Sequence, residues 1–257
     1  MTTTEPRDLP VDWEIRELLA STPVSRTWRI LAAGRPAVLR RDEPGAGRLG
    51  LNRVDEPGVL RAAAAAGLGP GPLGADPARG LLLTDWLPGR AWSAADLRAP
   101  ENLRRAAALL RQVHGLPVSR PVLDLAAVID RYAAAGGAGA DGLAPMARER
   151  LALALDGAPV LAAGRLRLCH NDPTPGNFIA AADGTLRLID WEYAGLCHPA
   201  FDLAGLALGA GLDPAGDELL LGAYAGQPPG PAGLARHGAW KDFCRALAAL
   251  WAAALIE

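Results

Sequence analysis

Apolar and polar residues alternate along the first forty residues with the two-residue period of β-strands. The alternation covers residues 11–20 and 24–33, and an apolar stretch follows at 37–40. The turn sequence Ala-Gly-Arg-Pro at 33–36 separates the last two segments, and a loop rich in glycine and proline covers 42–50. The pattern predicts a meander of three antiparallel strands.

After the predicted strands, an alanine-rich segment predicts a helix. The composition of residues 52–66 favours a helix, in which Pro57 marks either the first turn of its main part or a kink. Glycine and proline at 67–70 end it. The apolar run at 81–86 predicts a buried strand, and the breaker sequence at 87–90 predicts a hinge.

The remainder of the chain has a mostly helical pattern, interrupted by an island of short strands. The predicted helices cover 100–115, 125–135, 143–155 and the chain from about residue 199 onward. The predicted strands cover 166–169, 178–180 and 186–190, with an Asp-Gly hairpin turn between the last two. A strand-rich first third and a helical remainder are therefore expected.

Lysine is almost absent, and this narrows the possible chemistry. Of the 26 lysine and arginine residues, Lys241 is the only lysine. No Gly-x-x-x-x-Gly-Lys-[Ser/Thr] sequence includes it, so the chain has no P-loop, and a Schiff-base lysine would have to be Lys241 itself. Lys241 follows Trp240 near the C-terminus, and we expect it to be a solvated helix residue.

Composition and charge exclude several kinds of partner. The net charge is −2, which gives no basic field for nucleic acid. The cysteines Cys169, Cys197 and Cys244 form no CxxC pair, so neither a disulfide framework nor a zinc site is expected. The N-terminal sequence lacks a signal-peptide pattern, and the longest apolar run, 246–256, is shorter than a membrane span. We expect a cytoplasmic monomer or homodimer without a nucleic-acid or membrane partner.

The segment Cys-His-Asn-Asp-Pro-Thr-Pro-Gly-Asn-Phe at 169–178 carries the clearest chemical signal. The carboxylate of Asp172, on a rigid loop, can accept the proton of an attacking hydroxyl. Asn177 and, thirteen residues later, Asp190 offer hard oxygen ligands for Mg²⁺, which would neutralise charge on a transferred phosphoryl group. The order His-x-Asp-x-x-x-x-Asn followed by Asp is therefore typical of a phosphotransferase.

A metal-dependent hydrolase built on His170, Asp172 and Asp190 is the rival interpretation of this segment. Such a site would be expected to show a compact His-x-Asp-His motif or a further histidine cluster. The chain has only four histidines, and neither pattern occurs. The phosphotransferase interpretation is therefore favoured.

With its continuation Leu-Ile-Asp-Trp-Glu-Tyr-Ala-Gly, the segment resembles the aminoglycoside phosphotransferase / choline kinase superfamily, and within it the bacterial choline kinase and thiamine kinase branch. The resemblance is sharp over residues 170–204 and covers nearly the whole chain. It implies an α+β, bilobal protein-kinase-like fold. A small antiparallel-sheet N-lobe, residues 1–87, would bind the nucleotide. A larger, mainly helical C-lobe, residues 88–257, would hold the catalytic and acceptor-binding residues.

The resemblance also assigns roles within the C-lobe. Asp172 would be the catalytic base, and Asn177 and Asp190 would bind Mg²⁺. His170 would support the catalytic loop without itself doing chemistry. Asp202, in the family-like sequence Pro-Ala-Phe-Asp-Leu-Ala, would brace that loop through hydrogen bonds to its backbone.

In the N-lobe the resemblance implies a strand cation that holds the phosphates of ATP. Arg40, in Ala-Val-Leu-Arg, matches that cation, and the Asn-Arg-x-x-Glu sequence makes Glu56 its partner. An Arg–Glu pair can be bidentate and stays charged at any working pH. Adenine would meet the hinge backbone, where sequence does not separate ATP from GTP. The hinge residues concerned are Thr84, Asp85 and Trp86.

The loop that covers the phosphates departs from the family pattern Gly-Gly-x-x-Asn-x-x-Tyr. The aligned residues 21–28 contain no glycine, and Pro23 has no N–H to offer a phosphate. Hydroxyls such as that of Ser25 and the charge of Arg26 would have to serve instead. A non-catalytic nucleotide-binding pseudokinase therefore stays open beside an active enzyme.

For the acceptor, aromatic faces near carboxylates are typical of sites that hold a quaternary ammonium group. The candidate cage residues are Trp191, Glu192, Tyr193 and Trp240. Trp251 would point to a similar helix face as Trp240, although tryptophan on an alanine-rich helix is more often core. We expect a small cationic alcohol as acceptor, choline or ethanolamine first and thiamine second. An aminoglycoside-type acceptor is less favoured, because the last third of the chain is not strongly acidic.

Overall fold

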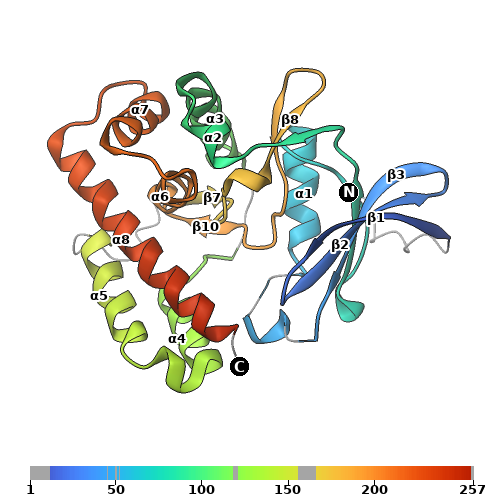
Figure 1. Ribbon diagram of the computed structural model, residues 1–257, viewed down its shortest axis with the longest axis horizontal. Helices are drawn as coiled ribbons and strands as arrows, with labels where there is room; N and C mark the ends of the chain where they lie inside the picture. Colours follow the sequence, from blue (N-terminus) through green and yellow to red (C-terminus); the bar gives the residue numbers. More distant parts are fainter. Residues whose placement is uncertain are drawn as a thin grey trace. The chain divides into compact units, whose positions relative to one another are not determined.

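The computed structural model describes residues 12–44, 46–49, 51, 53–117, 121–155 and 166–255 (Figure 1). Val11 and Asn52, predicted to begin a strand and a helix, lie outside the described residues. The chain divides into two compact units, Met1–Pro88 and Gly89–Glu257. The first is rich in strands and the second in helices, so the α+β class expected from the sequence is confirmed.

The N-terminal unit is built on a five-stranded antiparallel sheet. The predicted meander is present as β1 (Trp13–Ser21), β2 (Ser25–Ala32) and β3 (Arg35–Asp42). The predicted apolar strand is β5 (Leu81–Asp85), which pairs with β3 and with the edge strand β4 (Pro72–Asp76). The order is therefore β1-β2-β3-β5-β4. The sequence does not predict β4, because Pro-Leu-Gly-Ala-Asp is short and contains two strand breakers.

Apolar side chains of the sheet form the core of this unit. The core residues are Ile30, Ala32, Ala37, Leu39, Leu81 and Leu83. By contrast, the outer strand β1 is exposed along its whole length, and its register with β2 shifts between Ile15 and Glu17. This irregularity explains why the apolar positions change parity, from Trp13 and Ile15 to Leu18.

Helix α1 (Glu56–Ala65) completes the N-terminal unit and begins later than the predicted span of 52–66. Pro57 lies in its first turn, where the missing N–H costs no helical hydrogen bond. The first of the two roles expected for Pro57 is therefore confirmed. Gly67, with φ +73°, follows the end of the helix, as the sequence predicts.

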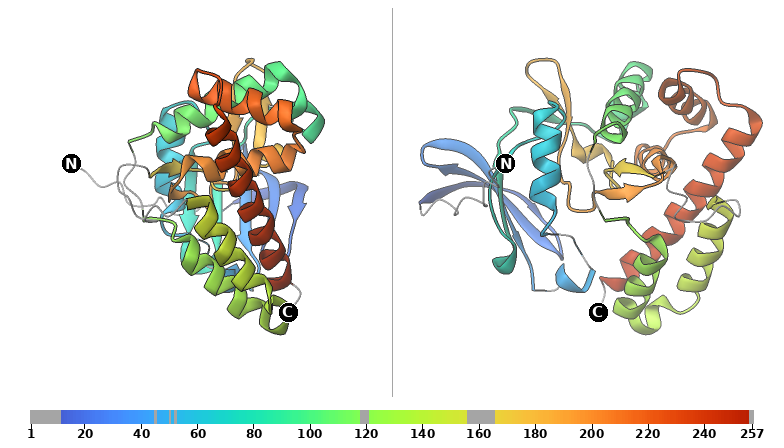
Figure 2. Two further views of the ribbon diagram at one scale, coloured as in Figure 1. Left: turned by 90° about the vertical axis from the view of Figure 1, so that its left-hand side faces the viewer. Right: turned by 180° about the vertical axis from the view of Figure 1, so that it is seen from behind.

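The C-terminal unit is mainly helical, as the apolar spacing indicates. Its helices are α2 (Ala94–Arg98), α3 (Pro100–His114), α4 (Leu125–Gly136), α5 (Leu143–Leu155), α6 (Pro199–Ala210), α7 (Pro214–Ala225) and α8 (Pro231–Ala254). The long helix α8 contacts α4, α5 and α6, as the views in Figure 2 show. Among the described residues, no helix combines the length and the apolar character that a membrane span requires.

Two small sheets interrupt the helices of this unit. The predicted hairpin is β8 (Phe178–Ala181) and β9 (Leu186–Leu188), and β6 (Gly89–Ala91) pairs with β8. A second sheet pairs β7 (Arg167–Cys169) with β10 (Gly195–Cys197). The sequence does not predict β6 and β10, because three residues are too few to show an alternation.

Lys241 corrects one expectation from the sequence. The residue is only 8 % exposed, and its Nζ donates to Asp217 Oδ2 at 2.6 Å. His237, one turn earlier on α8, has its Nε2 3.3 Å from Asp217 Oδ1. Lys241 is therefore a buried residue that joins α8 to α7 by an ion pair, because a buried ammonium group requires a charged partner.

Candidate active site

The segment 170–177 connects β7 to β8, and its first side chain is a buried anchor. The Nε2 of His170 donates to the carbonyl of Ile189 at 2.9 Å. The imidazole lies against the indole of Trp191, with ring centroids 4.8 Å apart. Complete burial lowers the pKa of His170, which favours the neutral ring. His170 thus ties the loop to the residue that precedes Asp190.

A second buried anchor is Asp202, in the first turn of α6. Its Oδ2 accepts the backbone N–H of His170 at 2.8 Å, and its Oδ1 accepts that of Asn171 at 2.7 Å. His114, at the end of α3, has its Nε2 3.0 Å from Asp202 Oδ2. Three hydrogen bonds therefore satisfy a fully buried carboxylate, and they fix the backbone immediately before Asp172.

Two residues of the region have a left-handed backbone conformation. Asn171 has φ 65° and Asp190 has φ 64°, and Ala33 is the only other non-glycine residue with positive φ in the described part of the chain. Asparagine and aspartate tolerate this conformation better than most residues. The Nδ2 of Asn171 also donates to the carbonyl of Tyr193 at 2.8 Å. Backbone strain of this kind concentrates at functional sites.

Asp172 and Asn177 contact each other directly. The Nδ2 of Asn177 donates to the backbone carbonyl of Asp172 at 2.8 Å and to its carboxylate Oδ2 at 3.1 Å. The 3₁₀ turn Pro175–Asn177 shortens the path between the two residues. Both contacts use the amide nitrogen of Asn177, so its amide oxygen, which is a hydrogen-bond acceptor, takes no part in binding Asp172.

The carboxyl group of Asp172 lies in an unusual electrostatic environment. Burial above all, and then the charges of Asp190 and Glu192, raise the pKa of Asp172 to about 7. The hydrogen bond from Asn177 acts in the opposite direction and is outweighed. A carboxyl group poised near neutral pH is suited to proton transfer. The amide of Asn177 and the carboxylate of Asp190 are oxygen donors of the kind Mg²⁺ prefers, so this donor set fits that ion.

Trp191 and Trp240, which the sequence places in an acceptor cage, are both buried. Trp191 is 1 % exposed, and its Nε1 donates to the carbonyl of Leu188 at 3.1 Å. Trp240 is 2 % exposed and lies among aromatic rings, with centroids 6.2 Å from Phe201 and 5.9 Å from Phe243. Both indoles belong to the core, whereas a cation needs access to a ring face.

The structure brings a different aromatic group to Tyr193. Its hydroxyl interacts with Tyr132 on α4 and with the indole of Trp251 on α8. Burial is the main cause that raises the pKa of both tyrosines, that of Tyr132 to about 12, and the nearby charges of Glu192 and Asp172 add to it. Three aromatic side chains and the buried Glu192 thus share the surroundings of Asp172. No sequence pattern indicates a site role for Tyr132, which occupies a core-like position on its helix.

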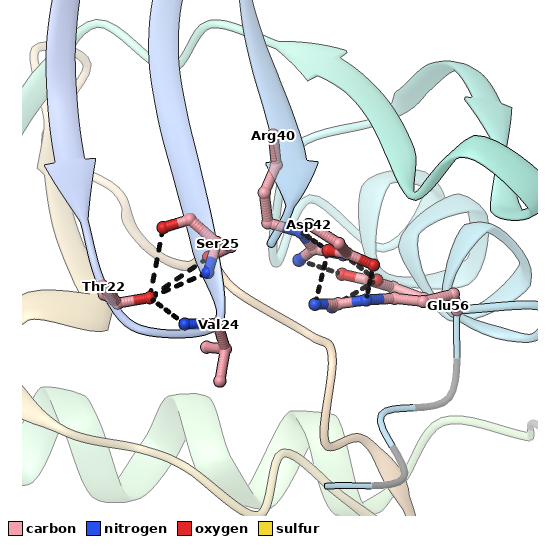
Figure 3. Close-up of polar contacts among 7 residues, drawn as sticks. Thr22, Val24, Ser25, Arg40, Asp42 and Glu56 are labelled. Atoms are coloured by element: carbon pink, nitrogen blue, oxygen red, sulfur yellow. Dashed lines mark hydrogen bonds and ion pairs between the residues drawn. The ribbon is translucent and has the colours of Figure 1, made fainter. Parts of the chain in front are cut away.

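In the N-terminal unit, Arg40 and Glu56 form a buried bidentate ion pair (Figure 3). The Nη1 of Arg40 donates to Glu56 Oε1 at 2.8 Å, and its Nη2 donates to Oε2. A second pair lies beside it, in which Arg53 Nε donates to Asp42 Oδ2 at 2.8 Å. The two carboxylates and two guanidinium groups balance each other, so burial of the charges is tolerated.

The turn between β1 and β2 closes on itself (Figure 3). The Oγ1 of Thr22 accepts the backbone N–H of Val24 at 3.3 Å and that of Ser25 at 3.0 Å. Pro23 has no N–H, so the turn satisfies its own backbone donors from residue 23 to residue 25. The side chain of Ser25 is buried, with its Oγ 3.5 Å from the Thr22 hydroxyl. These contacts differ from those of a glycine-rich loop, whose N–H groups point toward phosphate.

The predicted hinge side chains are engaged within their own unit. Thr84 is buried in β5. The backbone N–H of Asp85 donates to the Gly71 carbonyl at 2.9 Å, and its Oδ2 accepts the Gly71 N–H at 3.2 Å. The guanidinium of Arg29 lies 4.6 Å from the ring centroid of Trp86. These side chains therefore hold the end of β5 in place.

Comparisons with known proteins bear on this geometry. A family model described as the phosphotransferase enzyme family matches residues 18–240. Protein LicA of Haemophilus influenzae is 44% identical over 62 residues, which are 24% of this chain and 23% of that protein. The match thus spans about a quarter of that relative's length.

Solved structures resemble nearly the whole chain. A choline/ethanolamine kinase family protein from Mesorhizobium loti is 27% identical, with a TM-score of 0.72 over 95% of this chain and 80% of the other. The choline kinase LicA from Streptococcus pneumoniae is 20% identical, with a TM-score of 0.76 over 94% of this chain and 84% of the other. These likenesses confirm the protein-kinase-like fold expected from the sequence.

Proposed function

The chain belongs to the phosphotransferase enzyme family, as a small-molecule kinase, and on that premise we propose which reaction it catalyses. The γ-phosphoryl group of ATP passes to the hydroxyl of a small cationic alcohol. Choline or ethanolamine is the leading acceptor, and thiamine is the second. The observation that supports this most is the contact of Asn177 Nδ2 with Asp172 Oδ2 at 3.1 Å, on a loop whose backbone Asp202 holds.

In the proposed reaction Asp172 is the general base. It accepts the proton of the acceptor hydroxyl while the hydroxyl oxygen attacks the γ-phosphorus. The new oxygen–phosphorus bond forms as the bond to the β,γ-bridging oxygen breaks, and ADP leaves. The proton then passes from Asp172 to solvent, which a pKa near neutrality favours. His170 and Asp202 act as positioning residues, since a small displacement of the base is costly.

Asn177 and Asp190 are the residues that would hold Mg²⁺, which when bound neutralises charge on the phosphoryl oxygens. The support for this role is their chemistry and the effect of the Asp190 charge on Asp172. A cation there would also lower the pKa of Asp172 and keep the base ionised.

The N-terminal unit would bind the nucleotide. Arg40, held in one orientation by Glu56, presents a fixed positive charge for the phosphates. Ser25 lies in the turn that the family uses over the phosphates. The hinge backbone would meet adenine, at Thr84, Asp85 and Trp86.

The aromatic group near Asp172 supports a cationic acceptor. The faces of Tyr193 and Trp251, which are both partly exposed, together with the carboxylate of Glu192, suit an ammonium head. The hydroxyl at the other end of a short alcohol would then meet Asp172. A polycationic aminoglycoside needs carboxylates spread over a wider surface, so it stays the alternative acceptor.

An ADP-release assay with ATP, Mg²⁺ and one acceptor at a time tests the proposal. The acceptors are choline, ethanolamine, thiamine and kanamycin. We expect turnover with choline or ethanolamine to exceed that with kanamycin. Trp251→Leu should raise KM for the acceptor and leave KM for ATP unchanged, whereas Trp13→Leu, on the exposed strand β1, should change neither. Turnover with kanamycin alone would contradict the choice of acceptor.

A non-catalytic nucleotide-binding pseudokinase is the second candidate, and the self-closed β1–β2 turn favours it. In that case calorimetry would show ATP binding, while no acceptor would give ADP. The N–H groups of Val24 and Ser25 already donate to the Thr22 hydroxyl. They are therefore not available to hold the phosphates of ATP, as an efficient kinase requires.

A further inference from the structure

The catalytic loop and the segment that follows β9 meet in the candidate active site, where three hydrogen bonds join them. Two of these bonds involve Ile189. The Nε2 of His170 donates to the carbonyl of Ile189 at 2.9 Å. The backbone N–H of Ile189 donates in turn to the carbonyl of Asn177 at 3.0 Å. Both bonds fix the beginning of the segment, immediately before Asp190.

Asn171 makes the third hydrogen bond, further along the same segment. Its Nδ2 donates to the backbone carbonyl of Tyr193 at 2.8 Å. Because a carbonyl only accepts hydrogen bonds, the amide nitrogen must face it, which fixes the orientation of the side chain. The backbone N–H of Asn171 donates to Asp202 Oδ1 at 2.7 Å. Asn171 therefore connects Tyr193 to the braced part of the loop, immediately before Asp172.

The backbone conformation alone does not explain why residue 171 is an asparagine. With φ 65°, the position would suit a glycine at least as well. The Oδ1 of Asn171 is also buried without a hydrogen-bond partner in the described part of the chain, which is unfavourable. What asparagine provides and glycine lacks is the bond to Tyr193. The side chain is therefore explained better by that bond than by the stability of the loop.

We propose that Asn171 is a positioning residue that sets the distance between the ammonium site of the acceptor and the base Asp172. The inference rests on the proposed function, in which the ammonium head lies against Tyr193 and the hydroxyl meets Asp172. The hydroxyl of Tyr193 interacts with the indole of Trp251 and lies near the charges of Glu192 and Asp172. A fixed link between the loop and Tyr193 selects alcohols of one length, because a misplacement of about 1 Å at the reacting atoms can lower the rate about 10²-fold.

Acceptors that differ by one methylene group test this role in the ADP-release assay. The pairs are choline with homocholine and ethanolamine with propanolamine, and the longer alcohol of each has one more carbon between nitrogen and oxygen. Wild type should prefer the shorter alcohol by about tenfold or more in kcat/KM. Asn171→Gly keeps the left-handed conformation but removes the bond to Tyr193. The preference should then fall about fivefold, because the distance is no longer fixed, while KM for ATP stays unchanged.

Asn102→Ala is the matched control for the loss of an asparagine side chain. The Nδ2 of Asn102 also donates to a backbone carbonyl, that of Asp96 at 3.0 Å, outside the candidate active site. This variant should leave the preference unchanged. Asn171→Asp also tolerates the left-handed conformation and keeps the size of the side chain, but it lacks the N–H donor. It should lower the preference as well, and it keeps the test valid if Asn171→Gly does not fold.

A purely structural role for Asn171 predicts a different result. Both Asn171 variants would then lower kcat/KM for the two alcohols of a pair by the same factor, and the preference would not change. That result, or a wild type that does not discriminate within either pair, would overturn the inference and leave the proposed function in place. A wild type that uses none of the four alcohols would overturn the inference together with the leading choice of acceptor, so the two failures are distinguishable.

Discussion

The two units of the chain each hold a cluster of charged side chains, and the clusters differ in their balance. In the N-terminal unit, Arg40 faces Glu56 and Arg53 faces Asp42, so two positive charges meet two negative ones. Each carboxylate there has a guanidinium partner supplied by the same unit. Such a cluster is complete once the chain has folded, and it stabilises the structure whether or not a ligand binds.

In the C-terminal unit the neighbouring charges are alike. The charges of Asp190 and Glu192 add to the effect of burial and raise the pKa of Asp172. Like charges held together store repulsion, which a proton or a cation relieves. We conclude that the first cluster should govern stability, whereas the second should govern activity and the response to pH.

Asp172→Asn tests the activity half of this comparison and has the largest expected effect. The substitution removes the proposed base, so kcat should fall about 10²- to 10⁴-fold in the ADP-release assay. Calorimetric affinity for ATP should stay close to that of wild type, because the proposed nucleotide contacts lie in the N-terminal unit.

Asp183→Asn is the control for this variant, since Asp183 is an exposed carboxylate in the β8–β9 turn. It should leave kcat unchanged. Undiminished turnover in Asp172→Asn would show that Asp172 is not the base, and a similar loss in both variants would show that the effect is not specific to the site.

Glu56→Gln tests the stability half. It leaves the buried guanidinium of Arg40 with a neutral partner, so the free energy of unfolding should fall by about 3 kcal/mol. Glu14→Gln is the control, because Glu14 is exposed and pairs with Arg16 at 2.7 Å, and its loss should cost less than about 1 kcal/mol. Urea unfolding measures both. Equal losses would mean that the buried cluster stabilises the unit no more than a surface pair does.

The same contrast shows what the sequence could predict. Asp172 and Asn177 are five residues apart, and the chemistry of their segment is visible in its spacing. The bidentate contact between Arg40 and Glu56 also agrees with the motif-based expectation. Long periodic elements such as α3 and β2 were predictable because their apolar positions repeat.

Features that depend on packing between distant segments were not predictable. Tyr132 and Trp251 come together at Tyr193 only because α4 lies beside α8. Trp240 and Lys241 are buried by neighbours on α6 and α7 that no local pattern reveals. The strands β6 and β10 likewise form because they pair with β8 and β7. Each has only three residues, which are too few to show an alternation of apolar and polar positions.

The cluster of like charges around Asp172 should make the stability of the protein depend on pH. In metal-free wild type the pKa of Asp172 is raised from 3.8 to about 7. A raised pKa means that the folded state binds this proton more tightly than the unfolded state. Its contribution to stability is therefore complete below pH 4 and is lost as the pH rises through about 7.

The Asp172→Asn variant has no carboxyl group that binds this proton. Its free energy of unfolding should therefore increase relative to that of wild type as the pH rises. Between pH 5 and pH 8 we expect a gain of roughly 2 kcal/mol in the free energy of unfolding relative to wild type. Urea unfolding in EDTA at the two pH values measures it. A difference between the two proteins that does not change with pH would refute the raised pKa.

The smallest expected effect concerns the self-closed turn of the N-terminal unit. Thr22→Val keeps the shape of the side chain but removes the oxygen that binds the N–H groups of Val24 and Ser25. Those N–H groups then become available to the phosphates of ATP. Each hydrogen bond gained contributes about 0.5–1.5 kcal/mol, and the cost of ordering the turn reduces this gain. With one or two such bonds, KM for ATP should fall about two- to fivefold. Thr185→Val, in the exposed β8–β9 turn of the C-terminal unit, is the control and should leave KM unchanged. A rise in KM for Thr22→Val would mean that the closed turn is itself the form that binds nucleotide. The β1–β2 turn would then already have its binding conformation without a ligand, as the two ion pairs of the N-terminal unit do.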